Sequence, residues 1–486
     1  MVAAICIGLA WNGISSAGTA LGGEFAPDFK VRPDDYTVLM ACDVSPLPKG
    51  VKRSMATDHR KFDVTGWKRA DQSFTWVVTV PEDGGYAVNL LALQRSPQPV
   101  RFAVACGDSR VNTTTESEGW RRWDRHPLDG TLRLAKGTQT ITLKAQAVGD
   151  AAEFDLAVFS LELVRPAVRD RLRDAALKRR ADTKWFTEAR YGFMFHWVPA
   201  SCPRRGERKP YARAVQDFNV DAFADQVREG GAKFVVLTTA HALQHFPAPI
   251  QSLESILPGR TTQRDLVADL ADALGKRGIK LMLYYHLGCN SDPAWQQACG
   301  FWETDTSKFF NNWIRIVREV GEHYGDKLAG WWFDDGTLNY YYRSAPWERL
   351  TKAAKAGNPQ RLVAYNPWVM PSATEFQDYF CGEGADDPNG AGHLPVGGDG
   401  RFTGGPYQGL QACATLVTEG GWVHNRNDTE IGKPRWTARE MAKLLKDFGA
   451  TRNVPMFNLE IYQDGTMSPA TIAMFQEARQ LLRGRP

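Results

Sequence analysis

The 486-residue chain lacks several patterns that define whole classes of protein. Its eight cysteines form no Cys-x-x-Cys pair and no Cys/His cluster with zinc-site spacing. No glycine-rich loop follows an apolar strand, which argues against the usual dinucleotide and phosphate cradles. Beyond the first twenty-odd residues, no stretch is apolar over the roughly 20 residues that a membrane helix needs. We therefore expect no cofactor, no metal and no membrane span.

The chain also carries little excess charge. Its 59 Lys and Arg residues against 55 Asp and Glu residues give a formal net charge of +4 at pH 7. The most basic segment, residues 166–183, has a helical pattern, and we interpret it as a solvated linker helix, with polyanion binding as the less favoured alternative. We expect no nucleic-acid partner. The sixteen tryptophans are many, and exposed tryptophan is suited to stacking on sugar rings, although most tryptophans in any protein lie in its core.

The N-terminal residues indicate export. Residues 2–11 are a short apolar run and residues 16–20 are small, the order found in a secretory signal, although the basic leading region is missing. We interpret residues 1–24 as a signal remnant, or else as an N-terminal arm, and expect a secreted or periplasmic protein. In that setting Cys289 and Cys299 are the best-placed local disulfide pair, and buried free thiols are equally compatible with the sequence.

Residues 25–165 predict a β-sandwich. Short segments such as 73–80 and 138–145 alternate or run apolar over strand length, and turns rich in Gly and Asp separate them. The successive motifs FTWVVTVPEDGGY (74–86) and GTLRLAKG (130–137) resemble carbohydrate-binding sandwich modules of the family 6 and family 35 type. The resemblance supports the fold more than sugar binding. Trp120 and Trp123 are candidate stacking residues, or one of them belongs to the core.

From residue 184 to 486, buried short strands alternate with amphipathic helices about eight times, which predicts a (β/α)8 TIM-type barrel. An open doubly wound sheet is the alternative. In a barrel, polar residues just past the carboxyl ends of the strands build the active site. The residues selected by this rule are His196, Trp197, Thr239, His241, Tyr285, His286, Asp334, Asp335, Asn366, Trp368, Glu383 and Glu460. Carboxylates, histidines and aromatic rings together suit acid/base and nucleophilic chemistry on a sugar.

Four segments, in order along the chain, carry a family resemblance. They read WFTEARYGFMFHW (185–197), GAKFVVLTTAH (231–241), WFD (332–334) and TRNVPMFNL (451–459). Together they resemble strand motifs of the family 29 α-L-fucosidases over nearly the whole barrel. The resemblance implies a retaining exo-glycoside hydrolase that releases a terminal α-L-fucosyl unit from an oligo- or polysaccharide through a covalent glycosyl-enzyme.

The resemblance also implies roles for two carboxyl groups, about 5–5.5 Å apart in a retaining enzyme. Asp334 matches the family's nucleophile. Asp335 stands where the family has glycine, and because successive strand residues face opposite sides, only one of the two aspartates can face the pocket. Glu383 is the best acid/base candidate, since the glutamate of a later family motif, Trp-Glu-x-Cys, is replaced here by Gln411. Glu419 is a further possibility.

The sugar-binding segment departs from the family pattern. Where the family has Lys-His-His-Asp-Gly-Phe, residues 240–246 read AHALQHF, and Asn366 is followed by proline instead of leading to an arginine. Loss of such hydroxyl ligands can change the sugar that is bound. Two alternatives therefore stay open. One is the same mechanism on an α-L-galactoside or arabinose-configured unit. The other is a non-catalytic carbohydrate-binding protein, which Gln411 and the altered histidine pair suggest. The candidate hydroxyl ligands and stacking platforms are His196, Trp197, His241, Tyr285, His286, Asp335, Asn366, Trp368 and Trp422. The sequence does not determine the oligomeric state.

Overall fold

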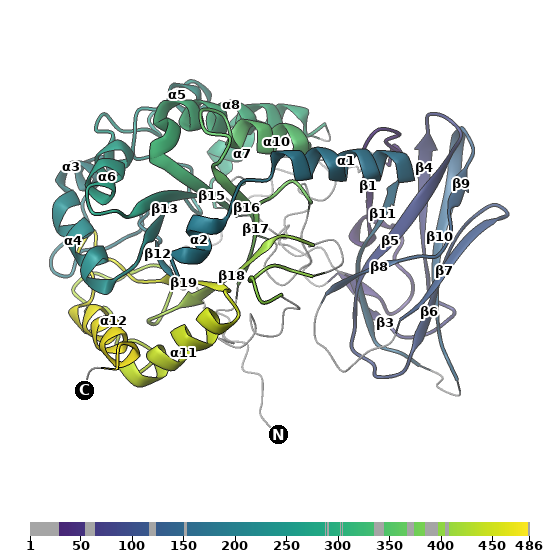
Figure 1. Cartoon of the computed structure of the whole chain (residues 1–486). Helices are drawn as coiled ribbons and strands as arrows, with labels where there is room; N and C mark the ends of the chain where they lie inside the picture. The colour runs from purple at the N-terminus through teal and green to yellow at the C-terminus, as the bar shows by residue number, and fades with distance from the viewer. Residues whose placement is uncertain are drawn as a thin grey trace.

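A β-sandwich and an eight-stranded parallel barrel, connected by one long helix, make up the protein (Figure 1), which confirms the predicted fold class. The computed structural model describes residues 29–53, 64–115, 123–149, 153–286, 288, 291–301, 303, 305–334, 345–366, 374–383, 397–403 and 408–484. The predicted signal segment, residues 1–24, lies outside the described residues.

Two antiparallel sheets form the sandwich. The first contains β1 (Thr37–Met40), β2 (Lys52–Arg53), β3 (Val64–Trp67), β5 (Gly84–Gln94), β8 (Asp124–Pro127), β9 (Leu132–Leu134) and β11 (Leu156–Val164), and a 3-10 turn, η1 (Ala41–Asp43), follows β1. The second has the strand order β4 (Ser73–Val80), β10 (Gly137–Ala147), β6 (Val100–Cys106) and β7 (Ser109–Thr115).

Side-chain alternation explains how the two sheets pack. In β4 the even-numbered residues from Phe74 to Val80 are buried, while Thr75, Val77 and Thr79 are exposed. Trp67 lies at the centre of the sandwich core, with ring centroids 5.0 Å from Phe74 and 6.0 Å from Phe102. Trp67 is therefore a core residue rather than a sugar platform.

The barrel strands have the order β16-β15-β14-β13-β12-β19-β18-β17. Their bounds are β12 (Gly192–Phe195), β13 (Phe234–Ala240), β14 (Lys280–His286), β15 (Leu328–Asp334), β16 (Leu362–Tyr365), β17 (Tyr379–Glu383), β18 (Gln411–Val417) and β19 (Val454–Asn458). Alternate residues of these strands fill the barrel and form a separate buried cluster. Phe186 closes the N-terminal end of this cluster, with its ring 4.9 Å from Phe234 and 5.0 Å from Tyr379.

Helices surround the barrel. They are α2 (Lys184–Glu188), α3 (Tyr211–Asp217), α4 (Val220–Gly230), α5 (Gln251–Ile256), α6 (Leu266–Gly275), α7 (Pro293–Cys299), α8 (Ser307–Tyr324), α10 (Trp347–Ala354), α11 (Ala438–Ala450) and α12 (Pro469–Leu482), with a 3-10 turn, η2 (Gly325–Lys327), after α8. Their ends follow local chemistry: Thr437 and Glu440 form a capping box at α11, and Gly231, with φ of +85°, ends α4.

The connecting helix is α1 (Pro166–Arg179), which runs from the end of β11 in the sandwich across to the barrel (Figure 1). Proline at its first position is pre-organised for a helix start. Its basic side chains are used in contacts within the protein: Arg171 donates to the carbonyl of Asp34, and Arg179 pairs with Glu348 of α10 at 2.7 Å.

Asp378, just before β17, joins β17 to β16 through its backbone and its side chain. The backbone of Asp378 donates to the carbonyl of Val363 at 2.8 Å, and its carboxylate accepts from the Val363 amide at 2.8 Å. The same carboxylate accepts from the amide of Ala181 at 2.6 Å and pairs at 2.8 Å with Lys355, the residue that caps the C-terminus of α10. One buried aspartate thus connects both edges of the sheet, the linker and a surrounding helix.

Arg361 fixes the start of β16 in a comparable way. Its guanidinium is fully buried and donates to the carbonyl oxygens of Gly321, Gly325, Leu328, Ala354 and Ala356. Burial lowers the pKa of Arg361 to about 10, so the group stays charged at neutral pH. A planar fork of donors is what this set of backbone acceptors requires, and lysine could not replace it.

The six cysteines of the described residues are buried, and no disulfide joins any two of them. Cys299 is one of them, its thiol donates to the carbonyl of Gln296, and its expected disulfide with Cys289 stays a prediction. Cys289 itself lies outside the described residues. Among the described helices, none combines the length and the apolar character that crossing a bilayer requires.

Replacing Asp378 by alanine is expected to lower the free energy of unfolding by about 3–5 kcal/mol, because Lys355, whose side chain is 8% exposed, would remain buried without its partner. Chemical denaturation followed by circular dichroism measures the change. Asp447→Ala is the control, since Asp447 pairs with Lys443 at 2.6 Å on the exposed face of α11 and its loss should leave the midpoint nearly unchanged. Equal effects of the two substitutions would contradict this role of Asp378.

Candidate active site

The side chains of β14 and β15 divide between the barrel interior and the helical layer. Tyr284 and Trp332 face the interior, with rings stacked 4.9 Å apart. Tyr285 and Trp331 face outward and belong to the core under the helices. Asp334 follows Trp332 by two residues and lies beside His286 in the parallel register, so it comes at the mouth of the barrel.

Asp334 is a buried carboxylate held by two neutral donors. The hydroxyl of Tyr284 donates to Oδ2, and the amide of Asn366 donates to Oδ1 at 3.0 Å. Asn366 is itself fixed because its backbone amide donates to the carbonyl of Phe333 at 2.7 Å. Only 7% of Asp334 is exposed. Donors of this kind favour the ionised carboxylate and fix its orientation, which is the condition that a nucleophile needs.

His196, at the end of β12, is the next member of the site. Its Nδ1 lies 2.8 Å from Oδ1 of Asn458, whose amide nitrogen donates to the carbonyls of Gly421 and Trp422. Because those two carbonyls fix the amide orientation, Asn458 presents an acceptor and His196 carries its proton on Nδ1. Burial lowers the pKa of His196 to about 4. The ring is therefore neutral at pH 7, with Nε2 as a hydrogen-bond acceptor.

Aromatic rings and histidines continue from His196 around the barrel mouth. The ring centroid of His196 lies 4.9 Å from Tyr284, 5.1 Å from Trp422 and 5.4 Å from His241. His241 in turn lies 5.5 Å from His286. The structure thus brings together, around Asp334, five residues named from the sequence: His196, His241, His286, Asn366 and Trp422.

Two sequence-based candidates lie elsewhere. Trp197 is 1% exposed, packs between Tyr211 and Phe218, and donates its indole N–H to the carbonyl of Gln463, so it is a core residue. Tyr285 points into the helical layer, where its hydroxyl accepts from the amide of Gln244. The strand rule selects the last residues of a strand without distinguishing its two faces, which explains both errors.

Other candidates fall beyond what the structure describes. Asp335 and Trp368 lie outside the described residues. The backbone of Glu383 is described as the last residue of β17, paired with Thr415 of β18, and its side chain is not among the described ones. β17 therefore brings Glu383 to the carboxyl end of the barrel, the end at which Asp334 lies.

Glu419 is a second buried carboxyl group near the end of β18. Its oxygens accept from the Thr471 hydroxyl at 2.6 Å and from the backbone amide of Glu460 at 3.0 Å. Burial raises the pKa of Glu419 to about 8, so it keeps a proton at neutral pH. Thr471 belongs to α12, so one Glu419 oxygen is directed to the helical layer. Glu460 follows at the mouth, 3.4 Å from Nδ1 of His424.

Gln411 has a structural role at the opposite end of the barrel. It is the first residue of β18, and its amide donates to the carbonyls of Gly400 and Arg452, while its oxygen accepts from Thr187 of α2. A residue at the amino end of a barrel strand contributes to stability rather than catalysis. The presence of glutamine here is therefore no sign of lost catalysis.

Two residues of the site were not identified from the sequence. Tyr284 and Asn458 contact Asp334 and His196 directly, and each lies two positions from an interior residue, Met282 and Met456 respectively. Strand parity would have found both. Within the described part of the chain, no group of three His, Cys, Asp or Glu side chains is placed to hold a metal ion.

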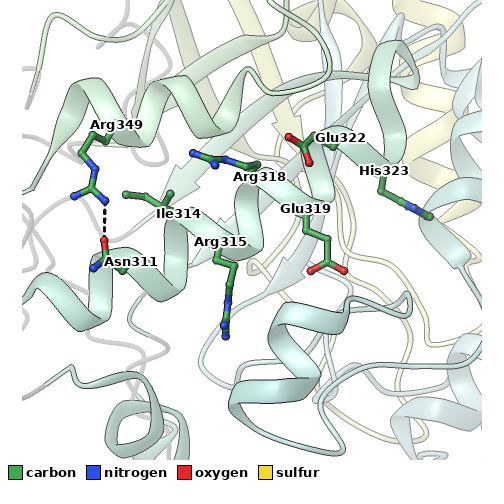
Figure 2. A pocket seen from close by; sticks show the side chains of 8 residues that line it. All are labelled: Asn311, Ile314, Arg315, Arg318, Glu319, Glu322, His323 and Arg349. Atoms are coloured by element: carbon green, nitrogen blue, oxygen red, sulfur yellow. Dashed lines mark hydrogen bonds between the residues drawn. The ribbon is translucent and has the colours of Figure 1, made fainter.

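A shallow groove of about 710 Å³ on the outer face of α8 is separate from this site (Figure 2). Its side chains are mostly paired within the protein: Arg349 donates to Asn311, and Glu319 accepts from the first amides of α5. Glu322 is exposed there. The groove lies along a helix, away from the strand ends, and has no part in the active-site geometry.

A buried, hydrogen-bonded carboxylate among histidines and aromatic rings at the strand ends of a barrel has the residue types that acid/base and nucleophilic chemistry on a sugar requires. Residues 209–482, more than half of the chain, match the family model described as Alpha-L-fucosidase. The chain belongs to the α-L-fucosidase family.

Several curated proteins and solved structures are similar to parts of the chain. The chain is 31% identical to tissue alpha-L-fucosidase of Macaca fascicularis over 147 residues and 31% identical to that of Homo sapiens over 138 residues. These alignments cover 23% and 21% of the chain and 31% and 29% of the two relatives, so the chain spans about a third of their length. A family 29 alpha-L-fucosidase structure from Bacteroides thetaiotaomicron has a TM-score of 0.45 at 15% identity, covering 63% of this chain and 74% of that one. An alpha-L-fucosidase structure from Lactobacillus casei has a TM-score of 0.45 at 18% identity, covering 64% and 98%.

The low pKa of His196 predicts an acid-sensitive fold. Between pH 6.5 and 4 the unfolded chain binds a proton at His196 that the folded protein does not, so stability falls as pH falls through this window. The full loss is about 3 kcal/mol by pH 4. NMR titration of the imidazole should show no protonation above about pH 5, and His196→Gln should weaken the pH dependence. Part of it should remain, because burial also lowers the pKa of His245 to about 4. Titration of His196 near pH 6.5 would contradict the assignment.

Proposed function

We propose that the protein is a retaining, exo-acting α-L-fucosidase that releases a terminal α-L-fucosyl unit from a glycan or polysaccharide. The observation that carries the proposal is Asp334, a buried carboxylate at the end of β15 in a barrel of this family, oriented by Tyr284 and Asn366. Retention requires such a carboxylate as nucleophile.

In the first step an oxygen of Asp334 attacks the anomeric carbon, and the bond from that carbon to the leaving oxygen breaks. A carboxylic acid protonates the leaving oxygen, and the sugar stays on the enzyme as an ester of Asp334. In the second step the same acid, now a carboxylate, takes a proton from water as the water attacks the anomeric carbon. Asp334 is regenerated, and the sugar leaves with its original configuration.

Glu383 is the acid/base in this proposal. It ends β17 at the carboxyl end of the barrel, the end at which β15 presents Asp334. Glu419 is the alternative, because burial raises its pKa to about 8 and keeps it protonated at neutral pH. Its contacts with Thr471 and the Glu460 amide use both of its oxygens within the protein, which favours Glu383.

The histidines and aromatic rings at the barrel mouth recognise the hydroxyl groups of the sugar in this proposal. Nε2 of His196 offers an acceptor, and Trp422, partly buried against the barrel interior, offers an apolar face for the sugar ring. A second candidate function, the same mechanism on an α-L-galactoside or arabinose-configured unit, is favoured by one feature. His241 is followed by Ala242, at a φ of +60°, where the family motif has a second histidine.

The remaining proposals concern the setting of the enzyme. The sandwich is proposed as a carbohydrate-binding module that directs the barrel to polysaccharide, on the support of its motifs and two-sheet fold. Trp123 packs edge-on against Phe159, at 6.2 Å between centroids, and Trp120 lies outside the described residues. A secreted or periplasmic location is proposed from the apolar and small residues 2–20.

Asp334→Ala should abolish hydrolysis of an aryl α-L-fucoside, because no ester can form. Added azide should enter the vacated space and restore partial turnover, giving a fucosyl azide of inverted configuration. Product analysis by NMR identifies it, and a panel of aryl glycosides tests the sugar. If the wild type hydrolyses another glycoside and not the fucoside, the proposed mechanism stands and the proposed sugar is replaced by that one. Full activity of Asp334→Ala would exclude this nucleophile.

Two adjacent tyrosines provide a matched pair of variants. Tyr284→Phe removes a hydrogen bond to the Asp334 carboxylate and should lower kcat/KM by about 10- to 100-fold, the effect of one charge-assisted hydrogen bond. Tyr285→Phe removes a hydroxyl of the same type that faces the helical layer, and it should leave kcat/KM nearly unchanged. Steady-state kinetics on the aryl fucoside compares them. The reverse order of effects would show that the wrong tyrosine has been placed in the site.

A further inference from the structure

A cavity of about 700 Å³ lies between the sandwich, α1 and the barrel. The sandwich contributes Tyr36, Asn89, Arg125 and Glu162 to its lining, and the barrel contributes Trp347 and Glu375. None of these residues contacts Asp334 or the ring cluster at the barrel mouth through any interaction described above. The cavity is therefore a second site, formed only where the two domains meet.

A buried ion pair forms one wall of the cavity. Arg125 Nε lies 2.8 Å from Oε2 of Glu162, and Arg125 Nη2 lies 2.8 Å from Oε1. The two side chains are 11% and 6% exposed, and the Asn89 amide donates to the same carboxylate at 3.5 Å. Burying two charges is expensive unless their geometry is fixed. The result is a rigid, planar array of donors and acceptors that faces the cavity.

Two further polar side chains, Tyr36 and Glu375, line the cavity. Within the described residues, neither the carboxyl group of Glu375 nor the hydroxyl of Tyr36 makes a hydrogen bond or ion pair. Burial raises the pKa of both groups above their ordinary values. Both side chains are only partly buried, so they can exchange hydrogen bonds to water for bonds to a ligand that both donates and accepts.

Part of the cavity lining is apolar. Tyr36 and Trp347 pack on the small cluster of Leu172, Ala176 and Phe376. The charged side chains around the cavity are nearly balanced, six arginines against five acidic residues, so the lining does not select a phosphate, sulfate or carboxylate. An apolar face beside hydroxyl groups that donate and accept is the chemistry of a neutral sugar.

We propose that this cavity is a second, non-catalytic binding site for a neutral oligosaccharide, built jointly by the sandwich and the barrel. The sugar's C–H face packs on Trp347 and Tyr36, and its hydroxyl groups bond to Glu375, Asn89 and the Arg125–Glu162 pair. The site does not depend on which sugar the barrel hydrolyses. Carbohydrate binding thus belongs to the surface of the sandwich that faces the barrel, and barrel residues complete the site.

Affinity electrophoresis of the full chain tests the proposal, with Asp334→Ala as the background so that the ligand is not cleaved. The gels contain a neutral galactoxyloglucan, a neutral galactomannan or an anionic polygalacturonate. Retardation by at least one neutral polysaccharide is expected. Tyr36→Phe and Glu375→Ala should each weaken it at least threefold, while Glu322→Ala, a matched change in the exposed α8 groove, should not. Thermal melts followed by circular dichroism check that each variant folds, and Tyr36→Phe removes only one hydroxyl group.

Three results would overturn the proposal: no retardation in either neutral gel, retardation by polygalacturonate alone, or neutral retardation that the two cavity variants leave unchanged. Hydrolysis separates this site from the catalytic one. With Asp334 restored, Tyr36→Phe and Glu375→Ala should hydrolyse a small aryl fucoside within about twofold of wild type, and a parallel loss of binding and hydrolysis would count against a separate site. If the wild-type chain hydrolyses no fucoside, the gel result still decides the question.

Discussion

The barrel depends on the carboxylate of Asp378. In the described residues the eight strands are joined by backbone ladders from β16 round to β17, and the remaining gap is bridged by Asp378, bonded to Val363 by backbone and side chain. The same group binds Ala181 of the linker and Lys355 at the C-terminal cap of α10. Closure at this point brings β16 beside β17, so that β15, which carries Asp334, and β17, which carries Glu383, end at one closed barrel mouth.

The sequence predicted the architecture because periodicity is a property of many residues. The alternation of polar and apolar residues in much of β4 and apolar runs such as 234–240 can be seen in the sequence, and the structure buries them accordingly. It predicted the site in part, because strand ends can be found but strand faces are harder to assign. Tyr285 was chosen and Tyr284 contacts Asp334, and Trp197 was read as a platform although it fills the core. One position along a strand reverses the side on which a side chain lies.

Contacts that come from tertiary packing had no signal in the sequence. Nothing local shows that Gln411 ties α2 to β18, so its mismatch with a family motif suggested lost catalysis. The position of the residue, at the amino end of its strand, removes that interpretation. Likewise the cavity beside Arg125 and Glu375 arises from residues about 250 positions apart, which only the docking of the two domains brings together.

The fixed tautomer of His196 affects the charge of the whole pocket. Since the imidazole stays neutral, it does not offset the negative charge of Asp334. Glycosyl transfer passes through a sugar ring that carries positive charge, and a neutral imidazole does not oppose that charge as it develops. The same property makes the pocket selective in another sense. It should hold a sugar-shaped ring bearing a protonated amine more tightly than the uncharged sugar of equal shape.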